Sequence, residues 1–127
     1  MFEQDYVMRQ IKELTKALAK ILFNVDSESP SAALIRDMRT RETADDLIRK
    51  IDNGRIFEAE NELSELLQDR TMDNFWAGIV FYSYLNEKDD DTLENDGFSR
   101  EKIKNGINHL VSEYGMETIS DLFYYDI

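Results

Sequence analysis

The sequence predicts an all-α fold, a small helical bundle of five to six helices in a single domain over residues 1–127. Only one proline and five glycines interrupt the 127 residues, and both residue types disfavour helix interiors. Apolar residues recur every third or fourth position, which is the spacing of a helix face. A chain of this length can bury one core without disulfides or metals, and it contains no cysteine.

The first helix is expected over residues 1–24, where the periodic pattern is strongest. Apolar residues follow one another at alternating spacings of four and three from Val7 to Val25, as in a helix seam. The flanking positions are largely uncharged, so the buried stripe is wide and needs two or more neighbouring helices. These come from the same chain or from a second copy. The favoured interpretation is a homodimer, with a candidate interaction surface at Val7, Ile11, Leu14, Leu18, Ile21 and Leu22.

The rest of the chain divides into a linker, residues 25–31, and a helical core, residues 32–127. Ser29 is the expected cap of the second helix, because Pro30 suits its first turn. A glycine after the last apolar position, Gly54, indicates its end. A break near Thr43 is left open, since Thr43 can cap a new helix.

The third helix is expected from Ile56 to Leu67, with an apolar inner face and glutamates on the face toward water. Thr71 caps the next helix. This helix is apolar nearly all round from Phe75 to Tyr82, which is typical of a central helix.

Residues 86–97 are expected to form a solvated, mobile acidic loop, because the segment has many carboxylates and no period. A further helix begins after Ser99, a suitable cap, and ends at Gly115, where a left-handed residue is favoured. A short last helix is expected from Met116 to about Tyr125.

Two glycines lie inside predicted helices, at Gly78 and Gly106. Each costs a helix about 1 kcal/mol relative to alanine. Two interpretations stay open, simple tolerance of the glycines or a close crossing of the two helices at these positions.

No catalytic, cofactor or metal site is predicted. His109, the one histidine, falls on a polar helix face. In the acidic segment, counting from Asp89 or from Asp91 fails to place the ligands, the glycine and the closing glutamate that a calcium loop needs. An aromatic pocket is the remaining candidate site for a small molecule, with residues Phe75, Trp76 and Tyr82, although such residues are more often core.

The charge and hydropathy disfavour nucleic-acid and membrane partners. The net charge of -12 repels a phosphate backbone, and no basic cluster overcomes it. The longest apolar run, Phe75 to Leu85, is about half of the ~20 residues that a spanning helix needs. The acidic start, Met1 to Asp5, is unlike a secretory signal, so a cytoplasmic protein is expected.

Two resemblances refine this interpretation. The segment Leu47 to Leu67, with GRIFEA at its turn, resembles a tetratricopeptide-like helical hairpin. Three blocks in order, MFEQDYVMRQIKEL, GRIFEAENEL and GFSREKI, resemble an uncharacterised family of short bacterial proteins. This resemblance implies a helical cytoplasmic protein and assigns no activity.

The expected function is a non-catalytic protein-interaction module whose partner is not named by the sequence. The alternative is a small-molecule-binding or enzymatic domain that uses the aromatic pocket around Trp76.

Overall fold

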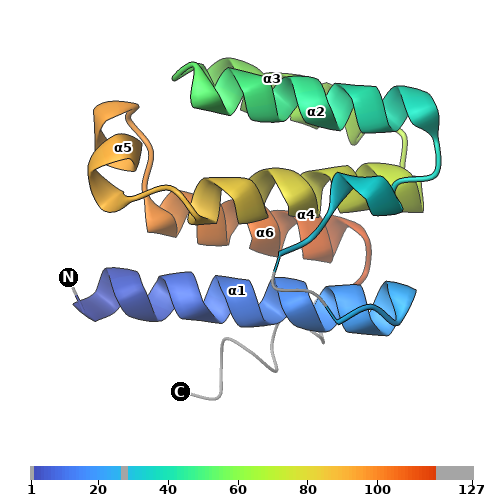
Figure 1. The fold of residues 1–127 in the computed structure, drawn as a ribbon, viewed down its shortest axis with the longest axis horizontal. Helices are drawn as coiled ribbons and strands as arrows, with labels where there is room; N and C mark the ends of the chain where they lie inside the picture. Colours follow the sequence, from blue (N-terminus) through green and yellow to red (C-terminus); the bar gives the residue numbers. More distant parts are fainter. Residues whose placement is uncertain (1, 27–28, 117–127) are drawn as a thin grey trace.

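The computed structural model describes residues 2–26 and 29–116 and confirms the all-α class. Six α-helices and one short 3-10 helix form all the regular structure of these residues (Figure 1). They are α1 Phe2–Phe23, η1 Ala32–Leu34, α2 Met38–Asp52, α3 Ile56–Leu66, α4 Met72–Asn86, α5 Asp90–Asn95 and α6 Arg100–Glu113. The last helix expected, from Met116 to Tyr125, lies outside the described residues apart from Met116.

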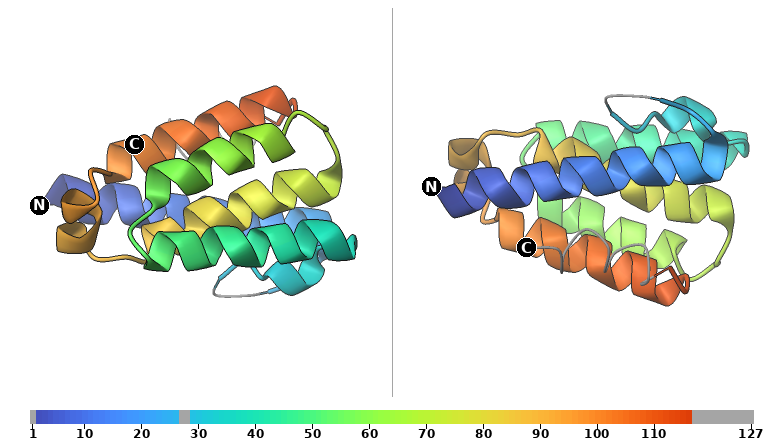
Figure 2. Two further views of the ribbon diagram at one scale, coloured as in Figure 1. Left: turned by 90° about the horizontal axis from the view of Figure 1, so that it is seen from above. Right: turned by 90° about the horizontal axis from the view of Figure 1, so that it is seen from below.

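The helices form three layers, with α4 and α6 in the middle (Figure 1). An antiparallel hairpin of α2 and α3 lies on one side, and α1 crosses the other side (Figure 2). The hairpin turns at Gly54, whose φ of +76° is in the left-handed region that glycine favours. Helix α2 packs on α4, and α1 packs on both α4 and α6. One core therefore joins the layers through α4.

Helix α4 is the central helix that the sequence predicts. Thr71 caps it by accepting a hydrogen bond from the Asn74 amide at 3.1 Å. Every residue from 74 to 83 is buried, because α1, α2 and α6 all contact this helix. Trp76 is fully buried, packs edge-on against Phe23, and donates its indole N–H to the carbonyl of Ser31 at 2.9 Å.

The apolar seam of α1 is covered by this same chain. Val7, Ile11, Leu14 and Leu18 are buried where α1 packs on α4 and α6. The prediction that these four residues form an interaction surface is therefore wrong. Both helices that cover the wide apolar stripe, α4 and α6, belong to the same chain. Of the remaining two residues, Leu22 is partly buried against the core and Ile21 is 60% exposed.

The second helix begins later than the sequence predicts. Ser29 does not cap it; Ser31 caps the 3-10 helix η1 instead. Asp37 caps α2 by accepting from the Thr40 amide at 2.9 Å. The carboxylate of Asp73, at the start of α4, accepts from the Asp37 amide at 2.8 Å. This tertiary contact fixes the start of α2. Ser29 and Pro30, which locally favour a helix start, therefore do not begin this helix.

Helix α2 is not broken near Thr43. The helix runs without interruption from Met38 to Asp52. The Thr43 hydroxyl donates to the Arg39 carbonyl one turn earlier at 3.0 Å. Its hydrogen bond is satisfied within the helix, so it caps nothing.

The acidic segment 86–97 contains a short helix, α5, which corrects the prediction of a loop; most of its carboxylates are exposed, as expected. Asp89 caps α5 by accepting from the Thr92 amide at 2.7 Å. Leu93 is 1% exposed, and its carbonyl accepts from the Phe98 amide at 2.8 Å. One buried leucine and two caps thus anchor a segment whose composition is typical of disorder.

The two helix glycines lie at a close crossing of α4 and α6. A Cβ atom on Gly78 would lie 2.7 Å from Leu110 Cδ2, and one on Gly106 would lie 2.4 Å from Tyr82 Cζ. Both distances are below contact distance for carbon atoms. The geometry favours the close-crossing interpretation over simple tolerance.

A polar contact between α2 and the end of α4 predicts a pH dependence of stability. Asp52 accepts from the Lys88 ammonium at 2.6 Å and from the Tyr84 hydroxyl at 2.8 Å. These bonds, that from Lys88 first, hold the pKa of Asp52 below its ordinary value. The contribution is therefore complete above about pH 4 and is lost as the pH falls through the lowered pKa of the folded state.

We expect Asp52→Asn to lower the free energy of unfolding at pH 7 by about 0.5 kcal/mol, a small loss because the pair is partly exposed. The difference from the parent chain should shrink below about pH 4. Urea titrations between pH 7 and pH 3 measure both. Asp45→Asn, at an exposed position of the same helix, is the control. A difference that stays constant over this range would contradict the argument.

Candidate functional site

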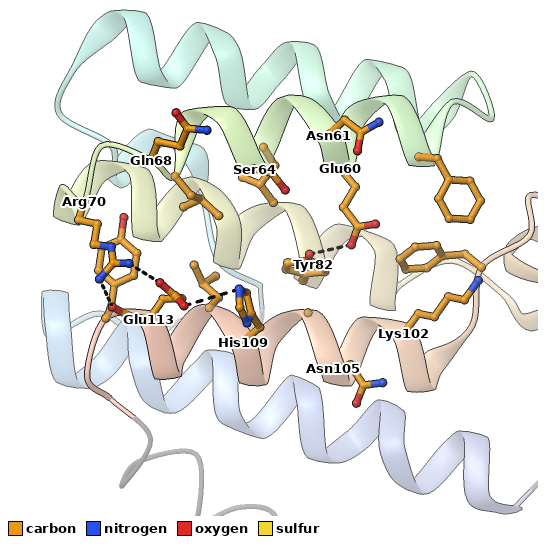
Figure 3. A pocket seen from close by; sticks show the side chains of 17 residues that line it. Glu60, Asn61, Ser64, Gln68, Arg70, Tyr82, Lys102, Asn105, His109 and Glu113 are labelled. Atoms are coloured by element: carbon orange, nitrogen blue, oxygen red, sulfur yellow. Dashed lines mark hydrogen bonds and ion pairs between the residues drawn. The ribbon is translucent and has the colours of Figure 1, made fainter.

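A groove lies between α3 and α6, over the side chain of Tyr82 on α4 (Figure 3). Its volume is about 800 Å³. Helix α3 packs on α2, whereas α6 packs on α4 and α1. The groove is therefore the space between the outer hairpin and the middle layer, on the side away from α2.

Each wall is a row of side chains from one helix face. The α3 row consists of Phe57, Asn61, Ser64 and Gln68. The α6 row consists of Lys102, Asn105, His109 and Glu113. Spacings of three and four place each row on a single face, and all eight residues are exposed.

The two rows run in the same direction, which sets the length of the groove. Lys102 meets Phe57 at one end. At the other end Glu113 pairs with Arg70, which follows α3 in the chain. At a rise of 1.5 Å per residue the rows are about 16 Å long, enough for an extended segment of about five residues.

Tyr82 and Glu60 form the floor. The Tyr82 side chain is only 6% exposed, and its hydroxyl donates to Glu60 Oε2 at 2.9 Å. Burial, and then the charge of Glu60, raise the pKa of Tyr82, so the phenol keeps its proton and holds the carboxylate in place. Gly106 leaves room for the ring, since a Cβ there would overlap it.

The two ends of the groove differ chemically. At one end the rings of Phe57 and Phe98 meet edge-on, with centroids 5.7 Å apart. The Lys102 ammonium lies 5.2 Å from the Phe57 centroid and donates to the Gly97 carbonyl at 3.0 Å. At the other end Arg70 binds both the carboxylate and the backbone carbonyl of Glu113.

His109 lies on the rim rather than at a converging site. Its side chain is 78% exposed, and Nε2 lies 3.8 Å from Glu113 Oε1, beyond hydrogen-bonding distance. The same carboxylate is bound by Arg70. A general base needs a hydrogen bond to its partner and a fixed orientation, and this geometry provides neither.

The structure separates the residues predicted to form an aromatic pocket. Tyr82 lies in the groove. Phe75 and Trp76 are fully buried in the core and do not line it, so the predicted pocket around Trp76 is wrong in these two positions. The α3 row was missed, because polar residues at this spacing on an amphipathic helix normally face bulk water.

The described residues contain no group of three or more histidine, cysteine or acidic side chains that could hold a metal ion. In the same part of the chain, no helix combines the length and the apolar character needed to span a bilayer.

Residues 1–115 match the profile of a family of unknown function, DUF6483. The chain belongs to this family. The match confirms the resemblance to an uncharacterised family, and it extends over both helices that line the groove, since α3 and α6 end before residue 115. No curated protein and no solved structure matches the chain.

Proposed function

We propose that this protein is a non-catalytic binding protein that holds a short, extended segment of another polypeptide in the groove between α3 and α6. The observation that carries the proposal is the pair of parallel side-chain rows along the groove. Both the length of the rows and their chemistry fit a peptide backbone.

Uncharged polar side chains line both walls in the middle of the groove. Asn61, Ser64 and Asn105 line it, and their side chains both donate and accept hydrogen bonds. An extended peptide presents N–H and C=O groups on alternating sides at about 3.3 Å per residue. Two facing rows can therefore bind its backbone from both sides, independently of its sequence.

An apolar anchor is available at one end. Phe57 is 49% exposed although it is a large aromatic residue, and it borders Phe98. A ligand that covers this ring removes apolar surface from water, which favours binding. Hydrogen bonds to the peptide backbone contribute less, because they replace hydrogen bonds to water. The groove is open along its rows, and this favours a chain segment over a small molecule, which is usually enclosed on most sides.

The polar groups of the groove favour a role in binding over a role in catalysis. Tyr82 holds its proton because its pKa is raised, and Glu113 is paired with Arg70. At neutral pH the Tyr82 phenol is therefore a hydrogen-bond donor and not a base.

An NMR titration of the full chain with a pool of capped random pentapeptides tests the proposal. We expect saturable shifts at backbone amides of residues 57–70 and 98–114, and none along α1 or α2. Shifts confined to other helices, or no saturable shift at millimolar peptide, would refute it.

A matched pair of variants locates the binding. Ser64→Tyr fills the groove from the α3 row, whereas Ser112→Tyr makes the same change at an exposed position of α6 that does not line the groove. We expect Ser64→Tyr to weaken binding at least about ten-fold, the loss of one well-packed contact region. Ser112→Tyr should leave affinity within about two-fold. Equal effects would count against the groove.

A further inference from the structure

We infer that the groove selects peptides that carry a basic side chain, and that the carboxylate of Glu60, positioned by Tyr82, is the group that binds it. This inference rests on the proposed peptide-binding function and names the chemistry of the partner.

Glu60 differs from the neighbouring acidic residues of α3 in its partners. Glu58 is paired with Arg55, and Glu62 is paired with Lys50. Among the described residues, no lysine or arginine forms an ion pair with Glu60, which instead accepts a hydrogen bond from the neutral hydroxyl of Tyr82. A carboxylate can accept about four hydrogen bonds, so Glu60, which lines the groove, can accept further hydrogen bonds from a ligand.

The position of Glu60 makes an external cation favourable. The residue is partly buried on the groove wall, where a charge is less well solvated than at an open surface. The hydrogen bond from the nearly buried Tyr82 fixes one carboxylate oxygen, so a ligand does not have to order the side chain on binding. Figure 3 shows Glu60 reaching from α3 toward Tyr82 in the floor.

The charges around the groove agree with a basic ligand. The chain carries a net charge of -12, which attracts a cationic peptide over long range. Two groove cations are already engaged: Arg70 is bound by Glu113, and Lys102 is held at the end by the Gly97 carbonyl. Lys102 also lies over the rings of Phe57 and Phe98, which shows that this end accommodates a cation on its aromatic faces.

The test compares two capped pentapeptides that differ only in charge, Ac-Ala-Ala-Arg-Ala-Ala-NH2 and the same peptide with neutral citrulline in place of arginine. Affinities are measured by NMR titration of the full chain at low salt. We expect the arginine peptide to bind about five-fold more tightly, the size of a partly exposed ion pair. The shifts should centre on residues 60–64 and 105–109.

Three variants assign this preference to Glu60. Glu60→Gln keeps an acceptor for Tyr82 and removes the charge, so it should bring the ratio of the two affinities to about one. Glu58→Gln removes an equal charge from the same helix, and it should keep the ratio. Tyr82→Phe removes the hydrogen bond that positions the Glu60 carboxylate, so it should lower the ratio, as expected for a positioning residue.

The outcomes separate the two proposals. Equal affinity for the two peptides in the parent chain, or an unchanged ratio in Glu60→Gln, overturns the inference and leaves peptide binding in place. If neither peptide shifts the groove amides, both the inference and the proposed function fail.

Discussion

Gly106→Ala is expected to destabilise the protein by about 2 kcal/mol, although alanine is the better helix former by about 1 kcal/mol. The sign is reversed because the new Cβ would lie 2.4 Å from Cζ and 2.6 Å from the hydroxyl oxygen of Tyr82. The ring is 6% exposed, so displacing it from Gly106 disturbs its packing, and overpacking of this kind costs about 1–3 kcal/mol. A displaced ring also loses its hydrogen bond to Glu60.

Urea titration of two backgrounds tests this explanation. In a Tyr82→Leu chain the obstructing ring atoms are gone, and Gly106→Ala should then be neutral or stabilising by up to about 1 kcal/mol. Ser112→Ala, at an exposed position of the same helix, controls for helix propensity. Gly97→Ala is a poor control, because Gly97 has a φ of +75° and lies against Phe57. If the Gly106→Ala variant is as stable as the parent chain or more stable, the close contact between α4 and α6 does not limit the residue at position 106.

The glycines illustrate how far the sequence alone determined the fold. Periodicity placed Gly78 and Gly106 on apolar helix faces. Because glycine destabilises a helix interior, its presence at both positions suggested a structural role. Which residues they meet depends on how two helices separated by more than ten residues are aligned. Leu110 and Tyr82 became identifiable as the partners only in three dimensions.

Helix existence was predictable, whereas boundaries followed tertiary contacts. The caps at Thr71 and Ser99 were correctly predicted because each is adjacent to a strongly periodic segment. The start of α2 was not, since it depends on Asp73, which lies 36 residues after the amide that it binds. The helix in the acidic segment was missed for a similar reason, because its single buried leucine, Leu93, gives no periodic signal.

The candidate site was the least predictable part. The sequence places Tyr82 in a pocket beside Trp76, but Trp76 is fully buried in the core. The groove exists because the hairpin of α2 and α3 stands away from α6, with the Tyr82 ring between them. That separation is a property of the packed molecule. Glu60, read from the sequence as one of four glutamates facing water, is recognisable as distinct only through its bond to Tyr82.

The second large effect is expected at Arg100, a buried cation that joins the end of α4 to α5 and α6. Its side chain is 4% exposed. The guanidinium donates to the carbonyl of Asn86 at 2.8 Å, to the carbonyl of Lys88, and to Asp90 Oδ1 at 3.2 Å. The Asn86 carbonyl ends α4 and the Lys88 carbonyl lies two residues beyond it, where no further helical amide is available to bind them. Arg100 therefore supplies the hydrogen-bond donors that water would supply if these carbonyls were exposed.

Arg100→Met should lower the free energy of unfolding by about 3 kcal/mol, because it leaves buried carbonyl groups without donors. Arg100→Lys should recover about half of this loss, since one ammonium cannot reach all three acceptors. Arg39→Met makes the same change at an exposed position of α2 and should stay within about 0.5 kcal/mol of the parent.

Hydrogen exchange distinguishes this role from a general loss of packing. If Arg100 holds α5 in place, amides of residues 92–98 should exchange faster in Arg100→Met, while those of α1 and α2 keep protection in proportion to global stability. The amides of Phe98 and Gly97, which bond to the carbonyls of Leu93 and Glu94, report the change most directly. A uniform increase over all helices would instead mean that Arg100 stabilises the whole core, because α5 would then unfold only together with α4.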